Sequence, residues 1–347
     1  MTTPTDVVSR IGSLEELYAA LPEHALAPLW TMEGALTPQP VTKMVPFVWR
    51  WDEVRSFISR AGDLISAEDA DRRVLAFRNP GTADHELARA TDTLWAAAQL
   101  VLPGEVAPPH RHTPAALRFI VEGTDGYTIV DGERLPMEVG DVTLTPNWTW
   151  HEHGNAGDGP MLWLDGLDIP LVASLRAVFA QFGSAGNDGP PPARASTRSL
   201  RSGELAPRHT GRRSRTLTYP YEDARAALDA LRDDEGSPHD DLILEYRDPQ
   251  ASGPALPTMS AYLQLLRPGT HTRAHRHTSS AVYHVAEGSG HSIVDGTRMD
   301  WAKGDTFAVP VWSLHEHVNE SGEDAVLFSF SDAPVLEALG LLRTQDG

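Results

Sequence analysis

The chain contains two copies of one sequence pattern. The tetrapeptide His-Arg-His-Thr occupies residues 110–113 and again residues 275–278, at an offset of 165 residues. The pattern Trp-x-x-His-Glu-His occupies residues 148–153 and 312–317, at an offset of 164 residues. Offsets that differ by one residue over this distance indicate that one fold has been duplicated within the chain.

Short β-strands are predicted in both copies. Gly, Pro and Asp-Gly turn signals separate short apolar runs, and Val130-Asp131-Gly132 is typical of a hairpin. The chain is therefore predicted to be mainly β, with two β-barrel domains and flanking helices. The expected boundaries are an N-terminal helical and extended arm (1–72), a first barrel (73–182), a linker and helix (183–235) and a second barrel (236–347).

The segments that flank the barrels carry helix signals. Ser13-x-x-Glu16 has the form of a capping box, which predicts a helix that begins after Ser13. Apolar periodicity predicts helices over 52–65, 171–182 and 222–232, and alternation predicts a strand over 73–78. The bulky segment 47–51 is expected to pack on a barrel, and residues 183–216, rich in Gly, Pro, Ser and Arg, are expected to form a linker whose role is open.

Composition excludes several classes of partner. A net charge of −19 argues against nucleic acid and anionic membranes, although one buried Arg could still hold a small anion. The absence of cysteine excludes disulfides and thiolate metal sites. No apolar run approaches the ~18 residues of a membrane span, and no signal peptide is recognisable, so a cytoplasmic location is expected.

Three histidines of the first copy predict a metal site. Residues two apart in a strand share a face, so His110 and His112 converge, and a returning strand can bring His151 beside them. Three neutral imidazoles leave a divalent ion its full charge and open positions, which favours an anionic chelator together with dioxygen. Fe(II) is the favoured redox metal, imidazole also suits Zn, Ni and Cu, and a structural or vestigial site is the alternative.

Arg118 is the second informative residue. The same alternation places it on the inward face of an apolar run, where an unpaired cation is costly. It could form an internal ion pair with Glu122 or Asp165. The functional interpretation is bidentate recognition of a substrate carboxylate.

The second copy retains the histidines and loses the other polar groups. His275, His277 and His315 make a candidate second metal site. The equivalents of Arg118, Trp150 and Asp165 are Tyr283, Leu314 and Ser329. The second barrel is therefore predicted to be capable of holding metal but not of binding the same substrate, and catalysis is assigned to the first.

The motifs resemble those of the cupin superfamily. Gly104-x5-His110-x-His112 with a later Gly123 matches the first cupin motif, and Gly140-Asp141 followed by Pro146 and His151 matches the second. Many cupins carry a Glu four residues after the second His, where this chain has Ala116. The resemblance implies a bicupin, with two barrels of the double-stranded β-helix type.

A closer resemblance is to the gentisate 1,2-dioxygenase family, which includes salicylate and 1-hydroxy-2-naphthoate dioxygenases. It rests on Leu-Arg118-Phe-Ile-Val-Glu-Gly, Asp-Gly-Glu-Arg and Pro-x-Trp-x-Trp-His-Glu-His-Gly-Asn, and it covers most of the chain. It implies a bicupin, usually a homotetramer, that uses non-haem Fe(II) and O2. Such enzymes cleave an aromatic ring between its carboxylated and hydroxylated carbons.

The resemblance also implies roles for residues at the matching positions. His110, His112 and His151 would be the iron ligands, Arg118 would grip the substrate carboxylate, and His153 would contact the ring hydroxyl or act as acid or base. Gln99, Trp95, Trp163 and Asp165 would line the pocket or support the ligands, with Asp165 among the catalytic groups. The alternatives are that the tryptophans are core aromatics, and that Gln99 and His153 are structural because they recur as Gln264 and His317.

The function hypothesis is extradiol-type ring cleavage, with conversion of gentisate to maleylpyruvate as the leading reaction. Salicylate, a 5-substituted salicylate and 1-hydroxy-2-naphthoate are the alternative substrates. A non-enzymatic storage or sensing bicupin and a metal-dependent isomerase or decarboxylase are the alternatives from other classes.

Overall fold

The computed structural model describes residues 11–34, 36–70, 72–83, 86–183, 194–195, 217–248 and 253–347. The chain divides into two compact units, residues 1–41 and 42–347. The predicted linker lies outside the described residues, apart from residues 183 and 194–195. No helix in the described part of the chain combines the length and the apolar character that crossing a membrane requires.

The N-terminal unit contains short helices. They are α2 (Leu14–Ala20), η1 (Leu21–His24) and η2 (Leu29–Thr31). Ser13 caps the helix as predicted, because the Glu16 backbone N–H donates to Ser13 Oγ at 3.2 Å. The Glu16 carboxylate accepts from the Gly12 N–H at 2.7 Å, in place of the Ser13 N–H of a full capping box. None of the residues in these three elements is buried.

The first barrel is built from two sheets of antiparallel pairs, with β12 added in parallel. Within the described residues, one sheet has the order β13-β8-β5-β10-β3-β2 and the other β11-β4-β9-β6-β7-β12. The strands are β2 (Arg73–Ala76), β3 (Trp95–Val101), β4 (Val106–His112), β5 (Ala116–Glu122), β6 (Gly126–Val130), β7 (Glu133–Met137), β8 (Val142–Thr145), β9 (His151–Asn155), β10 (Met161–Leu167), β11 (Ala180–Phe182), β12 (Arg194–Ala195) and β13 (Thr218–Tyr219).

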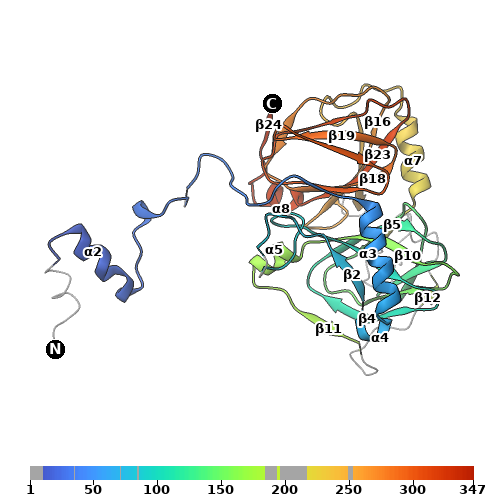
Figure 1. Cartoon of the computed structure of the whole chain (residues 1–347), viewed down its shortest axis with the longest axis horizontal. Helices are drawn as coiled ribbons and strands as arrows, with labels where there is room; N and C mark the ends of the chain where they lie inside the picture. The colour runs from blue at the N-terminus through green and yellow to red at the C-terminus, as the bar shows by residue number, and fades with distance from the viewer. Residues whose placement is uncertain are drawn as a thin grey trace, which may run out of the picture. The chain divides into compact units, whose positions relative to one another are not determined.

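The second barrel repeats this plan, as Figure 1 shows in orange and red. Its sheets, in the part of the chain that is described, have the orders β1-β21-β18-β23-β16-β14-β15 and β20-β19-β22-β17-β24. The strands are β1 (Phe47–Trp49), β14 (Leu242–Asp248), β15 (Gly253–Pro254), β16 (Ser260–Leu266), β17 (His275–His277), β18 (Ala281–Glu287), β19 (Ser289–Val294), β20 (Thr297–Ala302), β21 (Thr306–Val309), β22 (His315–Val318), β23 (Ala325–Ser331) and β24 (Thr344–Asp346). The expected mainly β bicupin is therefore confirmed.

The helices lie outside the barrels. They are α3 (Trp51–Leu64), α4 (Ala67–Ala70), α5 (Ile169–Ser174), α7 (Tyr221–Ala230) and α8 (Ala333–Ala338). Two predicted helices are confirmed to within two residues, as α3 and α7. The third prediction, a helix over 171–182, is wrong after Ser174, because Arg176 takes a positive φ of 57° and residues 180–182 pair with β4. Pairing with an exposed strand edge has overridden the apolar periodicity of this segment.

Each barrel is extended by the segment that precedes the other. β1, from before the first barrel, pairs with β21 of the second, and β13, from before the second, pairs with β8 of the first. After each of these two added strands, a backbone N–H donates to an aspartate of the barrel that the strand extends. The Trp51 N–H donates to Asp305 Oδ1 and the Tyr221 N–H donates to Asp141 Oδ1, both at 2.9 Å. The segment 47–51 therefore does pack on a barrel, and that barrel is the second.

Gly140 permits the close approach of Tyr221 to the first barrel, and this contact leads to a stability prediction. Its φ is +88°, and a Cβ at this position would come within 2.4 Å of Tyr221 Cγ. Gly140→Ala is expected to lower the free energy of unfolding by about 2–4 kcal/mol, through backbone strain and a clash with the start of α7. Gly296, with φ +79° and open space where a Cβ would lie, is the control, since Gly296→Ala adds strain alone, about 1 kcal/mol. Equal shifts of the urea midpoint in the two variants would contradict this account.

The two barrels share one hydrophobic core. It combines Leu117 and Phe119 of β5 with Phe328 and Phe330 of β23, and Phe119 stacks on Phe328 at 4.6 Å between ring centroids. Alternate residues of the same strands must therefore face the barrel interiors. This alternation of side chains determines which residues face the candidate site.

His284 lies in this interface and predicts acid sensitivity. The side chain is 2% exposed and lies beside Phe119, and its Nδ1 is 3.0 Å from Thr306 Oγ1. Burial lowers its pKa from 6.5 to about 4, and the charge of Asp305 opposes the shift. The unfolded chain therefore binds a proton first as the pH falls, so stability present above pH 6.5 is lost towards pH 4, by about 3 kcal/mol.

The measurement is the free energy of unfolding at several pH values for the native chain and for His284→Gln. The variant removes the titrating group, so its curve should be flatter between pH 6.5 and 4. Parallel curves would show that other groups govern acid unfolding.

Candidate active site

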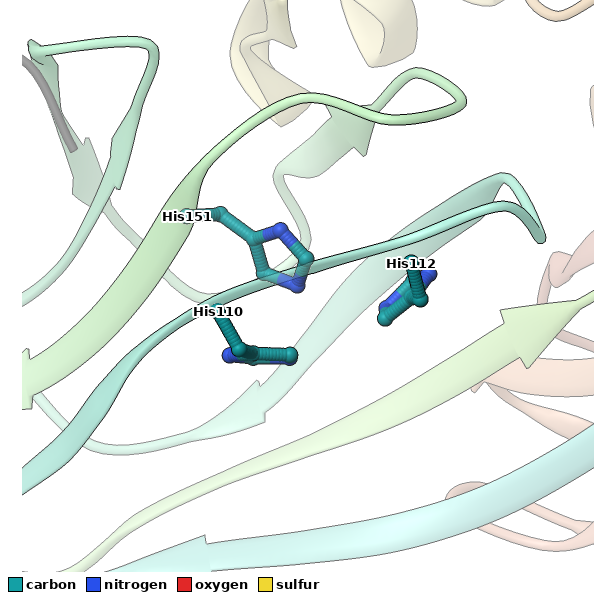
Figure 2. A group of neighbouring side chains, drawn as sticks. All are labelled: His110, His112 and His151. Carbon is teal, nitrogen blue, oxygen red and sulfur yellow. The ribbon is translucent and has the colours of Figure 1, made fainter. Parts of the chain in front are cut away.

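Three histidines of the first barrel converge on one point. His110 and His112 are on β4 and His151 is on the adjacent β9, where the register pairs His151 with His110. The ring centroids lie 4.0 Å apart for His110 and His151, 4.8 Å for His112 and His151, and 5.4 Å for His110 and His112. Figure 2 shows the three rings turned towards one another, and one nitrogen of each lies within 4.8 Å of the others.

Backbone carbonyls orient the rings. The Nδ1 atoms of His110, His112 and His151 lie 3.1, 2.7 and 3.0 Å from the carbonyl oxygens of Pro108, Pro114 and Thr149. A carbonyl only accepts, so Nδ1 carries the proton and the Nε2 lone pair is available to a metal. The His151 Nε2 is buried and has no hydrogen-bond partner among the described residues. The cage therefore fits a metal ion.

The rings are neutral at neutral pH. Burial lowers the pKa of His110 to about 2 and that of His112 to about 4. Burial also holds the pKa of His151 well below its ordinary value. Neutral imidazoles are the form that binds a metal, and they leave the charge of the ion uncompensated.

Arg118 faces the barrel interior, as predicted. Its neighbours Leu117 and Phe119 belong to the core between the barrels, and Arg118 itself is 3% exposed. Its Nη1 donates to Thr145 Oγ1 at 2.6 Å, and its Nε lies 3.1 Å from Asp165 Oδ1. The Nη2 group makes no hydrogen bond to any described residue, so one edge of the guanidinium is available to a ligand.

The ion pair with Asp165 was one of the expected alternatives for Arg118. The other, a pair with Glu122, is wrong, because Glu122 accepts from Arg55 at 2.8 Å on the outside of the barrel. Burial raises the pKa of Asp165 to about 6, and the charge of Arg118 opposes the shift. The pair thus keeps Arg118 in place while the carboxylate is itself poorly solvated.

Buried polar atoms without partners gather in this interior. Within the described residues, those near the cage are Gln99 Nε2, Thr143 Oγ1, His151 Nε2, His153 Nδ1 and Trp163 Nε1. Each such group costs on the order of 1–3 kcal/mol when it stays unsatisfied. The unpaired groups that lie near Arg118 and the cage are therefore available to a polar ligand.

His153 and Trp163 adjoin the cage. His153 is fully buried on β9, with ring centroids 5.6 Å from His151 and 5.4 Å from Trp163. Trp163 pairs with Gln99 of β3 and packs among Val101, Ile120 and other apolar side chains. Trp163 is thus a core aromatic, as one alternative held, but its indole N–H still lacks an acceptor among the described residues.

The remaining predicted tryptophans have other neighbours. Trp95 is half-buried at the start of β3, opposite Leu167. Trp148 and Trp150 stack under the Arg111 guanidinium at 4.4 and 4.8 Å, which indicates a structural role.

Sequence reasoning did not identify Arg72 as a site residue. It precedes β2, its Nη2 donates to Pro108 O at 3.4 Å, and its guanidinium lies 6.0 Å from the Phe182 ring. Its charge is close enough to lower the pKa of His110 and His112, after the larger effect of burial. No strand alternation points to a residue that lies before a strand, so the sequence carried no signal for it.

Comparison with known proteins gives consistent results. The cupin domain family matches residues 98–167 and 262–331. Gentisate 1,2-dioxygenase 1 of Aquipseudomonas alcaligenes is 40% identical over 95% of each chain, and 5-aminosalicylate 1,2-dioxygenase of Comamonas sp. is 42% identical over 96% of this chain and 90% of the relative. The crystal structure of the salicylate 1,2-dioxygenase of Pseudaminobacter salicylatoxidans with gentisate has a TM-score of 0.84 and 34% identity, covering 97% of this chain and 94% of that one.

The predicted family is confirmed by these relatives, in preference to a storage bicupin or an isomerase. Each of the two matched domains contains a histidine cage, and the inward arginine lies in the first. This chain belongs to the family of bicupin ring-cleaving dioxygenases that includes the gentisate and salicylate 1,2-dioxygenases.

Proposed function

We propose that this protein opens gentisate to maleylpyruvate by extradiol-type cleavage, in the first barrel, with Fe(II) held by His110, His112 and His151. The observation that carries the proposal is Arg118, a buried cation beside a cage of three neutral histidines, with one guanidinium edge available. A planar carboxylate is the ligand that this edge matches bidentately. The reaction class follows from the family, and the substrate and residue roles are proposed.

The residues around the cage divide the work. A bound Fe(II) would supply a common binding site for the aromatic acid and dioxygen, and a path for electrons between them. Arg118 binds the carboxylate and so fixes the ring relative to the cage, while Asp165 and Thr145 hold the guanidinium. His153 exchanges a proton with the ring hydroxyl. It is suited to this role because its Nδ1 has no partner among the described residues and its ring lies beside His151.

Gentisate is proposed because its second ring hydroxyl, para to the first, makes the ring electron-rich and the attack by oxygen easier. A 5-substituted salicylate is the second candidate. It is favoured by the relative that acts on 5-aminosalicylate, which is as similar to this chain as the gentisate enzymes. The interior offers Gln99 Nε2 and Trp163 Nε1 as unpaired donors, and either could bind a hydroxyl or an amino group at that ring position.

The test is a panel of gentisate, salicylate, 5-aminosalicylate and 1-hydroxy-2-naphthoate with protein reconstituted anaerobically with Fe(II). Oxygen uptake is followed with an electrode, and ring-opened products are identified by mass spectrometry. The highest kcat/KM is expected for gentisate. A higher value for a salicylate would replace gentisate as the substrate, and no oxygen uptake with any acid would refute the site assignment. Protein loaded with Zn(II) is the control, since it should bind the acids without consuming oxygen.

We propose further that the chain assembles as a homotetramer. The family resemblance implies this state, and several large apolar side chains of the N-terminal unit are exposed, among them Trp30 at 72%. Exposed apolar side chains in this number are typical of interaction surfaces. Light scattering after size-exclusion chromatography measures the mass directly, and a monomeric mass at assay concentration would contradict the proposal.

A further inference from the structure

The second barrel contains a cage that matches the first. The ring centroids lie 5.5 Å apart for His275 and His277, 4.3 Å for His275 and His315, and 5.0 Å for His277 and His315. One nitrogen of each ring lies within 4.8 Å of the others. The Nδ1 atoms of His277 and His315 contact the carbonyl oxygens of Ser279 and Ser313 at 2.7 and 2.9 Å, which leaves Nε2 available. The His315 Nε2 is buried without a hydrogen-bond partner in the described structure. His151 of the first cage has the same buried Nε2 without a partner in the described residues.

The space beside the second cage is filled by aromatic side chains. Tyr283 stands where the first barrel has Arg118, and Phe307 stands where it has Thr143. These two rings stack at 4.9 Å with 7° between their planes, inside the apolar cluster of this barrel, and Tyr283 lies 4.9 Å from the His317 ring. An aromatic acid would have to displace this stack.

One polar contact beside the second cage is already made within the barrel. The Nδ1 of His317 is 2.8 Å from Ser292 Oγ, which also accepts from Trp301 Nε1 at 2.9 Å. The equivalent His153 Nδ1 of the first barrel has no partner among the described residues. A substrate would therefore find no buried Arg or Lys in the described part of this barrel, and the histidine next to the cage already has a partner at its Nδ1.

The two barrels differ in buried charge. Arg118 is buried inside the first barrel, and its position in the second is taken by the uncharged Tyr283. Without a buried cation, the second interior has no group of the described chain to hold an anionic acid. The second cage is thus suited to the metal alone.

Few backbone pairs join the strands that carry the three ligands. β17 pairs with β22 through His275 and His315, and the segment before β17 contacts the same strand through the bridge of His271 with Val318 and the Thr272 N–H, which donates to His317 O at 3.0 Å. The other edge of β17 is covered by the C-terminal strand β24, where Asp346 pairs with His275. A metal bound by histidines of β17 and β22 would join the two strands where few backbone hydrogen bonds do.

We propose that the second barrel binds a divalent transition-metal ion through His275, His277 and His315, in a site closed to aromatic acids, where the ion stabilises the barrel by joining β17 to β22. The proposal adds a metal site with a structural role to the catalytic one. It does not depend on which acid is the substrate.

The decisive variant is His112→Ala, which removes a ligand of the first cage and leaves the second barrel intact. The full-length variant is stripped of metal and titrated with Co(II), whose visible spectrum reports its ligands. We expect one tightly bound equivalent, a melting temperature higher by about 5 °C or more with the metal, and a spectrum that gentisate does not change. Native protein should bind two equivalents.

The reciprocal variant is His277→Ala, with His277→Gln as a substitute if the alanine variant does not fold. It should bind one equivalent, and gentisate should change its Co(II) spectrum. Loaded with Fe(II), it should keep turnover per chain within about twofold of the native protein. Absence of Co(II) binding by folded His112→Ala would overturn the proposal, as would a gentisate-dependent spectrum in that variant. Either result would leave the assignment of the first barrel unaffected.

Discussion

Arg118→Ala is expected to lower kcat/KM for the aromatic acid by about 10²–10³-fold, mainly through a higher KM, with the metal content unchanged. Charge-assisted hydrogen bonds to a buried guanidinium contribute roughly 1.5–3 kcal/mol each, and the variant loses a bidentate pair. It also leaves Asp165 without its partner at 3.1 Å in a buried site, which adds a cost in stability. Steady-state kinetics and metal analysis of the same preparation measure both effects.

Two further variants separate binding from structure. Arg118→Lys keeps the charge but not the planar fork, so its KM should fall between those of the native protein and the alanine variant. Asp165→Asn should preserve part of the substrate affinity, because the guanidinium and its bond to Thr145 remain. Loss of metal from Arg118→Ala would show that the arginine supports the cage instead of binding substrate.

His153→Gln is expected to lower kcat by about 10²–10³-fold with little change in metal content or in the affinity for the acid. The reason is that proton transfer by a positioned histidine contributes rate acceleration of this size. Gln retains hydrogen-bonding capacity but cannot take up a proton at neutral pH. Single-turnover oxygen consumption with preformed anaerobic complex measures the step without contributions from substrate binding.

The matched control is His317→Gln, at the equivalent position of the second barrel. There the histidine Nδ1 is hydrogen-bonded to Ser292, which also accepts from Trp301, so the change should reduce stability and leave kcat within about twofold. Equal losses of kcat in the two variants would mean that His153 is a structural residue of the fold. Loss of metal from His153→Gln would likewise assign it a structural role.

Local patterns predicted much of the site. The alternation of strand residues placed His110 and His112 on one face and Arg118 inside the barrel, and both placements hold. The capping box at Ser13 likewise marked where α2 begins. These predictions succeed because they depend on the period of a strand or the geometry of a helix end, which involve residues close together in the chain.

Contacts between distant segments could not be predicted in this way. The ion pair of Arg118 with Asp165 instead of Glu122, and the approach of Arg72 to the cage, depend on which strands lie side by side. Residues 180–182 show the same limit, since their apolar pattern suits a helix but the free edge of β4 makes them a strand. Likewise, sequence spacing marked the substitution of Tyr283 for Arg118, but only packing revealed the stack with Phe307.

The sequence by itself determined the duplication, the two histidine cages and the asymmetry of charge between the copies, because each of these is a matter of residue identity at a fixed spacing. The tertiary structure alone decided that each barrel is extended by the segment that precedes the other, and that the second barrel is filled beside its cage. Strand pairing and core packing join residues far apart in the chain, and their free energy depends on the whole set of surfaces that come together.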